Sequence, residues 1–78
     1  MNDKINEIYD KLCLKIKFER LKRNLIQDEL ADAAHLNKSS IADIENKRTS
    51  PTIHTLIKIA LVFNMTISEL TDVSKIDL

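Results

Sequence analysis

Small polar and charged side chains follow one another in the middle of the chain. Lys38, Ser39 and Ser40 come directly after Asn37, and Asp43 lies about one helical turn further on. Ammonium, hydroxyl and carboxylate groups can donate and accept hydrogen bonds. Because these side chains are slim, a helix that carries them can fit into a narrow groove. These residues can therefore recognise a ligand through hydrogen bonds and charge, without covalent chemistry.

The composition argues against catalysis and against a bound cofactor. The 78 residues include no glycine, one cysteine (Cys13) and two separated histidines, His35 and His54. Phosphate-binding loops, dinucleotide turns and nucleophile elbows need glycine where the backbone turns left-handed or approaches a ligand closely. One cysteine with two distant histidines does not make a zinc site. We therefore expect no enzyme, whether hydrolase or thiol enzyme, and no metal, cofactor or small-molecule ligand.

The formal charge is zero, but it is unevenly distributed along the chain. Twelve Lys and Arg balance twelve Asp and Glu, with a net +5 over residues 11–23 and −3 over residues 28–32. A polyanion responds to the local face of a protein and not to the sum of its charges. We interpret residues 11–23 mainly as a solvated helix face. No apolar run is long enough to cross a membrane, so a cytoplasmic protein is expected.

The periodicity of the apolar residues predicts an all-α fold. Helices are expected over residues 5–23, 27–34 and 38–45, from Pro51 to about Asn64, and from Thr66 through Leu70. The core side of the first helix is expected to carry Ile5, Ile8, Tyr9, Leu12, Cys13 and Ile16. The core side of the fourth is expected to carry Ile53, Leu56, Ile57, Ala60 and Phe63. No linker divides the chain, so residues 1–78 are interpreted as one domain.

Polar residues stand where these helices must begin and end. Asn37 is expected to cap the third helix, and Ser50 to cap the fourth with Pro51 in its first position. Thr66 and Glu69 have the spacing of a capping box. The helix C-termini fall at four turns that lack glycine, and we expect positive φ at some of the residues there, namely Asn24, His35, Asn64 and the pair Asn46-Lys47.

Two short helices joined by the turn His35-Leu36-Asn37 form a helix-turn-helix, whose second helix can enter the major groove of DNA. The surrounding sequence resembles the Cro and phage-repressor type (Xre-like) family of helix-turn-helix regulators. The matching residues are Arg20, Gln27, Leu30-Ala31, Ile41, Ile44-Glu45, Pro51, Leu56, Ala60, Phe63 and Ser68-Glu69-Leu70. The resemblance covers residues 12–71, with the motif at 27–46 and a tail at 72–78. It implies a five-helix, lambda-repressor-like domain.

The resemblance also implies roles for individual residues. Base reading falls to Lys38, Ser39, Ser40 and Asp43, with Lys38 suited to guanine and Asp43 to cytosine. Phosphate binding falls to Gln27, Asn37, Asn46, Lys47 and Arg48. Arg20 and Glu45 are expected to form a structural ion pair between the first and third helices. Ile26 stands where the family usually has Ser or Thr, so the second helix is expected to begin without a side-chain cap.

Together these features predict a sequence-specific double-stranded DNA-binding transcriptional regulator. It would bind an operator as a homodimer and occlude or recruit RNA polymerase. The dimer candidates are Leu61, Ile67, Val73 and Ile76, with Leu78 in the tail. A phage-type repressor, a restriction–modification controller and an autoregulating antitoxin all fit this class. The competing interpretation is an antitoxin or adaptor that acts mainly by binding another protein through Leu14, Phe18 and Leu21.

Overall fold

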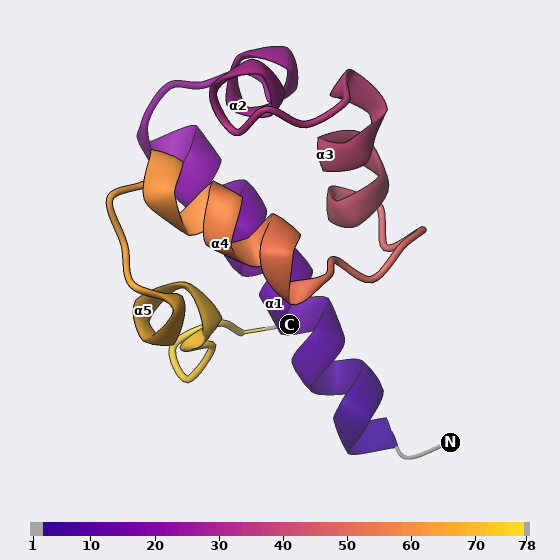
Figure 1. Cartoon of the computed structure of the whole chain (residues 1–78). Helices are drawn as coiled ribbons and strands as arrows, with labels where there is room; N and C mark the ends of the chain where they lie inside the picture. Colours follow the sequence, from indigo (N-terminus) through magenta and orange to yellow (C-terminus); the bar gives the residue numbers. More distant parts are fainter. Residues whose placement is uncertain (1–2, 78) are drawn as a thin grey trace.

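The computed structural model describes residues 3–77, which contain five helices joined by short loops (Figure 1). They are α1 (Asp3–Lys22), α2 (Gln27–Ala33), α3 (Lys38–Glu45), α4 (Ile53–Val62) and α5 (Ile67–Thr71). No strand occurs within these residues. The prediction of an all-α fold with five helices is therefore confirmed. Leu78, one of the residues proposed for the dimer, lies outside the described range.

The long first helix sets the shape of the molecule. α1 has 20 residues, or about 30 Å at the helical rise, and the longest dimension of the fold is 34 Å. Figure 1 shows α4 in front of α1, with α3 and α5 to either side and α2 above. The first turns of α1 extend beyond the other helices in this view.

One apolar cluster holds the five helices together. Its buried members come from every helix, together with Phe63, which follows the last residue of α4: Ile16, Leu30, Ala31, Ile41, Ile44, Leu56, Ile59, Ala60, Phe63 and Leu70. Leu12, Leu25, Leu36, Val62, Met65 and Ile67 pack around it and are partly buried. The hydrophobic effect at this cluster is what fixes the positions of α2 and α3.

Two of the expected core stripes are wrong in part. Ile5 and Ile8 are exposed, because the first turns of α1 lie beyond the helices that would cover them. Ile53 and Ile57 are also exposed, and Ile59 takes the buried position that had been assigned to them. The buried side of α4 follows the spacing of Leu56, Ile59, Ala60 and Phe63, which leaves Ile53 and Ile57 on its flank.

The N-terminal caps also differ in part from expectation. Thr52, and not Ser50, caps α4: its hydroxyl accepts a hydrogen bond from the Thr55 amide at 3.2 Å, and Pro51 lies before the helix. The capping box at α5 is confirmed, since the Glu69 amide donates to the Thr66 hydroxyl at 3.0 Å and the Thr66 amide donates to the Glu69 carboxylate at 2.8 Å. Hydrogen bonds from the Thr66 main chain and side chain hold the pKa of Glu69 below its ordinary value.

Four helices end in the same way without glycine. Positive φ occurs at Asn24 (56°), His35 (56°), Lys47 (61°) and Asn64 (56°), which confirms the prediction for these turns. In each case the amide of the next residue donates to a carbonyl five residues back, as in a Schellman motif. These bonds are Leu25 to Arg20, Leu36 to Ala31, Arg48 to Asp43 and Met65 to Ala60, at 2.8–3.2 Å.

Candidate nucleic-acid interface

α2 and α3 pack tightly together and leave one side of α3 uncovered. Ile41 and Ile44 are buried against the core, and the small Ala31 and Ala34 of the preceding segment are buried beside them. The Leu36 amide closes the turn through its 2.8 Å bond to the Ala31 carbonyl. α3 is therefore held by its apolar side, and its polar side faces outward.

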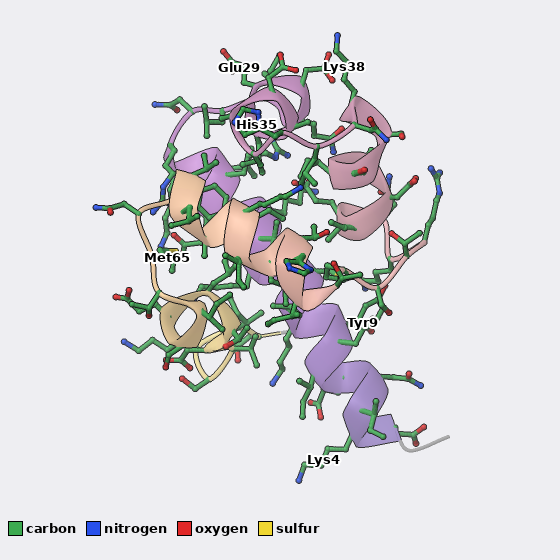
Figure 2. All side chains as sticks on the ribbon, in the orientation of Figure 1. Lys4, Tyr9, Glu29, His35, Lys38 and Met65 are labelled. Atoms are coloured by element: carbon green, nitrogen blue, oxygen red, sulfur yellow. The ribbon has the colours of Figure 1, made fainter. Side chains whose placement is uncertain are left out.

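The four residues predicted to read bases lie on or beside this outward side. Lys38 and Ser39 are exposed, whereas Ser40 and Asp43 are half-buried. Figure 2 shows Lys38 pointing away from the body of the molecule at the start of α3. The residues thus present an ammonium group, two hydroxyls and a carboxylate along about one and a half turns of helix.

Asn37 occupies the N-cap of α3 but does not cap it with its side chain. Its backbone is extended, and its side chain makes no cap hydrogen bond. The Ser40 amide instead donates to the Asn37 main-chain carbonyl at 2.9 Å. The expected side-chain cap is therefore wrong. The amide group of Asn37 lies exposed beside the N-terminus of α3, a position at which helices favour anions.

Three cations around α3 each face a carboxylate. Lys38 Nζ lies 3.8 Å from Asp28, Lys47 Nζ lies 3.6 Å from Asp10, and Arg48 Nη1 lies 3.5 Å from Asp43. All three pairs are partly or largely exposed to solvent. Exposed pairs of this kind contribute about 0–1 kcal/mol each, so a phosphate group can replace the carboxylate at little cost.

The loop between α3 and α4 is anchored on α1. The Tyr9 hydroxyl donates to the Thr49 carbonyl at 2.9 Å, and Asp10 pairs with Lys47, two residues earlier in the loop. Figure 2 shows Tyr9 on the part of α1 nearest this loop. Burial, with the neighbouring Cys13 acting in the same direction, raises the pKa of the Tyr9 hydroxyl. The loop that carries Lys47 and Arg48 is therefore tied down at two points.

Arg48 differs from its counterparts at the other helix ends. At the ends of α1, α2 and α4 the residue that closes the Schellman bond is Leu25, Leu36 or Met65, and each packs against the core. At the end of α3 the same position is Arg48, whose backbone makes the bond while its side chain remains exposed. This helix end thus places a cation where the others place an apolar anchor. Asn46 and Lys47, also predicted to bind phosphate, lie exposed beside it.

Gln27 is held by a buried ion pair between α1 and α3. Arg20 Nε and Nη2 donate to the two oxygens of Glu45 at 2.7 and 2.9 Å, and Arg20 Nη1 donates to the Leu25 carbonyl at 2.7 Å. Gln27 Nε2 donates to the same Glu45 carboxylate at 3.1 Å. The hydrogen bonds to Glu45 raise the pKa of the Arg20 guanidinium above its already high value. The side-chain amide of Gln27 is therefore oriented at the start of α2.

Several cations of the basic segment 11–23 bind the protein itself. Lys15 Nζ donates to the carbonyls of Glu69 and Asp72 at 3.1 and 2.8 Å, at the C-terminal end of α5. Arg23 donates to the Phe63 carbonyl and to the Glu19 carboxylate, both at 2.8 Å, and its guanidinium lies 4.6 Å from the centre of the Phe63 ring. The contacts of Lys15 with the end of α5 and of Arg23 with Phe63 could not be predicted from the sequence, because tertiary packing alone brings these residues together.

The thiol of Cys13 is buried within the fold. Cys13 is a buried free thiol, and burial raises its pKa, which disfavours the nucleophilic thiolate. Residues 3–77 contain no group of three or more His, Cys, Asp or Glu side chains that could hold a metal ion. Within the same residues, no helix is both long enough and apolar enough to span a bilayer.

The residues predicted for a dimer lie on α4, α5 and the segment that follows. Leu61 has 73% of its surface exposed, the most of any large apolar residue described. It borders a shallow groove between the end of α2 and α4, which is also lined by Ala33, Ala34, His35, Lys58 and Val62. Ile67, Val73 and Ile76 are half-buried. The exposed Ile53 and Ile57 lie at four-residue steps before Leu61, so α4 carries an apolar stripe toward solvent.

Comparison with known proteins places this arrangement among regulators. Residues 16–70 match the family model described as helix-turn-helix. The chain is 37% identical over 60 residues to the ImmF control region 10 kDa protein of Bacillus phage phi105, with 77% of this chain and 67% of that protein covered. It is 31% identical over 62 residues to the HTH-type transcriptional regulator DdrOP3 of Deinococcus deserti, with 80% of this chain and 48% of the regulator covered. The chain thus spans about half the length of the Deinococcus regulator.

Proposed function

Since the chain belongs to the Cro and phage-repressor type of helix-turn-helix family, which consists of DNA-binding transcriptional regulators, we propose that it binds a specific operator with α3 in the major groove. The observation that carries the proposal is the outward side of α3, where Lys38, Ser39, Ser40 and Asp43 stand on a helix whose other side is buried. Slim polar side chains at the start of a recognition helix reach base edges in this way.

Phosphate contacts on either side of α3 would fix the register on DNA. Gln27 and Asn37 lie at the N-termini of α2 and α3, and Asn46, Lys47 and Arg48 lie beyond the C-terminus of α3. The phosphates would replace the carboxylates of Asp10 and Asp43 as partners of Lys47 and Arg48. This exchange lowers the affinity for arbitrary DNA, and it leaves sequence recognition to the base contacts.

A homodimer would double these contacts at an operator with two half-sites. The exposed stripe of α4 with Leu61 supports an interface on that side of the molecule. Half-buried Ile67, Val73 and Ile76 extend the same candidate set over α5 and the segment after it. Two-fold association of small helix-turn-helix domains commonly matches the pseudo-palindromic form of their operators.

Binding to a duplex selected from a random pool tests the proposal across a salt series. The logarithm of the affinity should fall linearly with that of the salt concentration from about 50 to 200 mM. Arg48→Ala should weaken binding to all sequences and reduce the salt slope by about one. Lys38→Ala should also relax the preference at one base pair, at a cost of about 1–3 kcal/mol for the preferred base.

Two further variants serve as controls. Lys17→Ala removes an exposed cation of α1 to which no contact with DNA or within the dimer is assigned, and should leave affinity and slope unchanged. Asp28→Asn removes the carboxylate beside Lys38 and should strengthen binding to DNA of arbitrary sequence. A flat salt response, or equal affinities for the Arg48→Ala variant and the wild type, would contradict the proposed interface.

A further inference from the structure

The outward side of α3 carries one negative charge among its four proposed base-reading residues. Asp43 contributes a carboxylate that is 33% exposed, whereas Lys38 contributes an ammonium group and Ser39 and Ser40 contribute hydroxyls. An ionised carboxylate accepts hydrogen bonds but donates none. A DNA groove is bordered by phosphates and contains many base atoms that also only accept. Asp43 therefore opposes close approach to DNA unless a positive group or a hydrogen-bond donor meets it.

The end of α3 provides a positive group in the free protein. The Arg48 amide donates to the Asp43 carbonyl at 2.8 Å, and this main-chain bond brings the two side chains together. Arg48 Nη1 donates to Asp43 Oδ1 at 3.5 Å, while the Arg48 side chain is 68% exposed. An ion pair this long and this exposed is readily exchanged for another partner. Arg48 is thus both the neutralising partner of Asp43 and a cation that a phosphate can reach.

The four bases do not receive a carboxylate equally. With α3 in the major groove, as proposed above, binding of Arg48 to a phosphate would leave Asp43 facing the base edges. Guanine presents two acceptors there, thymine an acceptor and a methyl group, and adenine an acceptor next to a donor, whereas cytosine presents the N4 donor alone. A carboxylate at this position is therefore repelled or left without a partner except where it meets cytosine.

We propose, on the basis of the proposed function and its placement of α3, that Asp43 acts with Arg48 to exclude DNA of the wrong sequence. A phosphate separates Arg48 from Asp43 on any duplex, and only a cytosine at the position of Asp43 then supplies a donor to its carboxylate. Loss of Lys38 weakens binding, whereas loss of the Asp43 charge strengthens binding to unrelated sequences. Specificity of this kind comes from a penalty on the wrong partner.

A second acid–base pair separates this effect from simple competition for a cation. Asp10 Oδ1 lies 3.6 Å from Lys47 Nζ, and Asp10 is 34% exposed, almost the same as Asp43. Asp10 belongs to α1, however, and not to the helix proposed to enter the groove. Removing the charge of either aspartate frees a cation for phosphate. Removing the charge of Asp43 also takes a carboxylate away from the base edges.

Asp43→Asn tests the inference, because asparagine keeps the size and one acceptor oxygen of the side chain. Fluorescence anisotropy measures its binding to a selected duplex, to a duplex of unrelated sequence, and to variants of the selected duplex with each base pair replaced in turn. The affinity for the unrelated duplex should rise at least about tenfold, while the affinity for the selected duplex changes by less than about threefold. At one base pair the preference for cytosine should be lost.

Asp10→Asn is the matched control, and it should raise the affinity for both duplexes by the same factor. An acid near the C-terminal end of α3 does not stabilise that helix, so Asp43→Asn should keep the helical content of the wild type. An equal gain of Asp43→Asn at both duplexes, or an equal loss because Arg48 stays on Asp43, would overturn the inference. The proposed interface is judged separately, by the salt response of the wild type and by Arg48→Ala.

Discussion

Arg20 and Glu45 form a pair at 2.7 Å whose side chains are only 9% and 3% exposed. Lys38 and Asp28 form a pair at 3.8 Å whose side chains are 69% and 54% exposed. Removing one partner from a buried pair leaves an uncompensated charge and costs about 3–5 kcal/mol. An exposed pair contributes about 0–1 kcal/mol. Burial thus separates a contact that fixes the fold from contacts that a ligand can exchange.

The Glu19 carboxylate gives the stability of the molecule a pH dependence. Burial alone would raise the pKa of Glu19, but hydrogen bonds from Arg23 at 2.8 Å and Lys22 at 3.1 Å outweigh burial and lower it. Because the pKa is lower in the folded state, the stabilisation is present above the unfolded pKa of 4.5 and is lost as the pH falls through the folded value. Glu19→Gln should lower the free energy of unfolding by about 1–2 kcal/mol at pH 7.

Urea unfolding between pH 7 and pH 3 measures this difference. The difference in the free energy of unfolding between the wild type and Glu19→Gln should stay constant down to about pH 5 and become smaller below it. Glu7→Gln is the matched control, since Glu7 pairs with Lys11 at 3.8 Å on the surface and its loss should change stability by less than about 0.5 kcal/mol. If this difference in the free energy of unfolding stayed constant across the pH range, the charge of the Glu19 carboxylate would not contribute to stability.

At the scale of the elements, the helix ends carry local strain. A residue with a Cβ in the left-handed region costs about 1–2 kcal/mol, and Asn and Asp tolerate that region best. Lys47, at φ 61°, is therefore a less favourable choice than Asn24 or Asn64. Lys47→Gly should stabilise the protein by about 1 kcal/mol and raise the melting temperature by about 4–8 °C. It should also weaken DNA binding, because it removes a proposed phosphate contact.

Asn46→Gly is the control for this substitution. Asn46 is adjacent and also exposed, but its φ is −91°, so glycine relieves no strain there and adds freedom to the unfolded chain. The melting temperature of Asn46→Gly should be equal to or lower than that of the wild type. If the melting temperatures of Lys47→Gly and Asn46→Gly rose equally, relief of left-handed strain at Lys47 would not explain the stabilisation.

The elements whose signals are local could be predicted from the sequence. The bounds of α3, the capping box of Thr66 and Glu69, and the positive-φ turns depend on a few neighbouring residues and agree with the structure. The start of α4 could not be decided in this way, because Ser50 and Thr52 are both acceptable caps and only the path of the loop selects Thr52.

The contacts around the candidate interface could not be predicted, because they join distant parts of the chain. Asp10 with Lys47 and Asp28 with Lys38 are such contacts, and no periodicity or spacing indicates them. The exposure of Ile5 and Ile8 depends on where the neighbouring helices end, which is also a property of the packed molecule. The roles proposed for individual residues toward DNA remain predictions.

At the scale of the whole molecule, the proposed dimer would link association through the exposed stripe of α4 to DNA binding. Ile57→Ser/Leu61→Ser should reduce self-association and lower the affinity for a duplex with two half-sites by at least about tenfold. Its affinity for a duplex with one half-site should remain that of the wild type, because α3 is unchanged. Analytical ultracentrifugation with gel-shift titration of the two duplexes measures both effects.

The Phe18→Ser/Leu21→Ser variant is the control, since it removes exposed apolar residues from α1 and leaves α4 unchanged. It should bind both duplexes like the wild type. If the α4 variant kept full affinity for the two-half-site duplex, the dimer would have to use a different surface, such as the region of Ile67, Val73 and Ile76.

The anchoring of the α3–α4 loop on α1 has a thermodynamic consequence for recognition. Tyr9 holds the Thr49 carbonyl before any ligand arrives. A loop that is already ordered loses little conformational entropy when it meets a phosphate backbone, so less of the contact energy is offset by ordering. If the loop binds DNA as proposed, Tyr9 would support the affinity through this preorganisation.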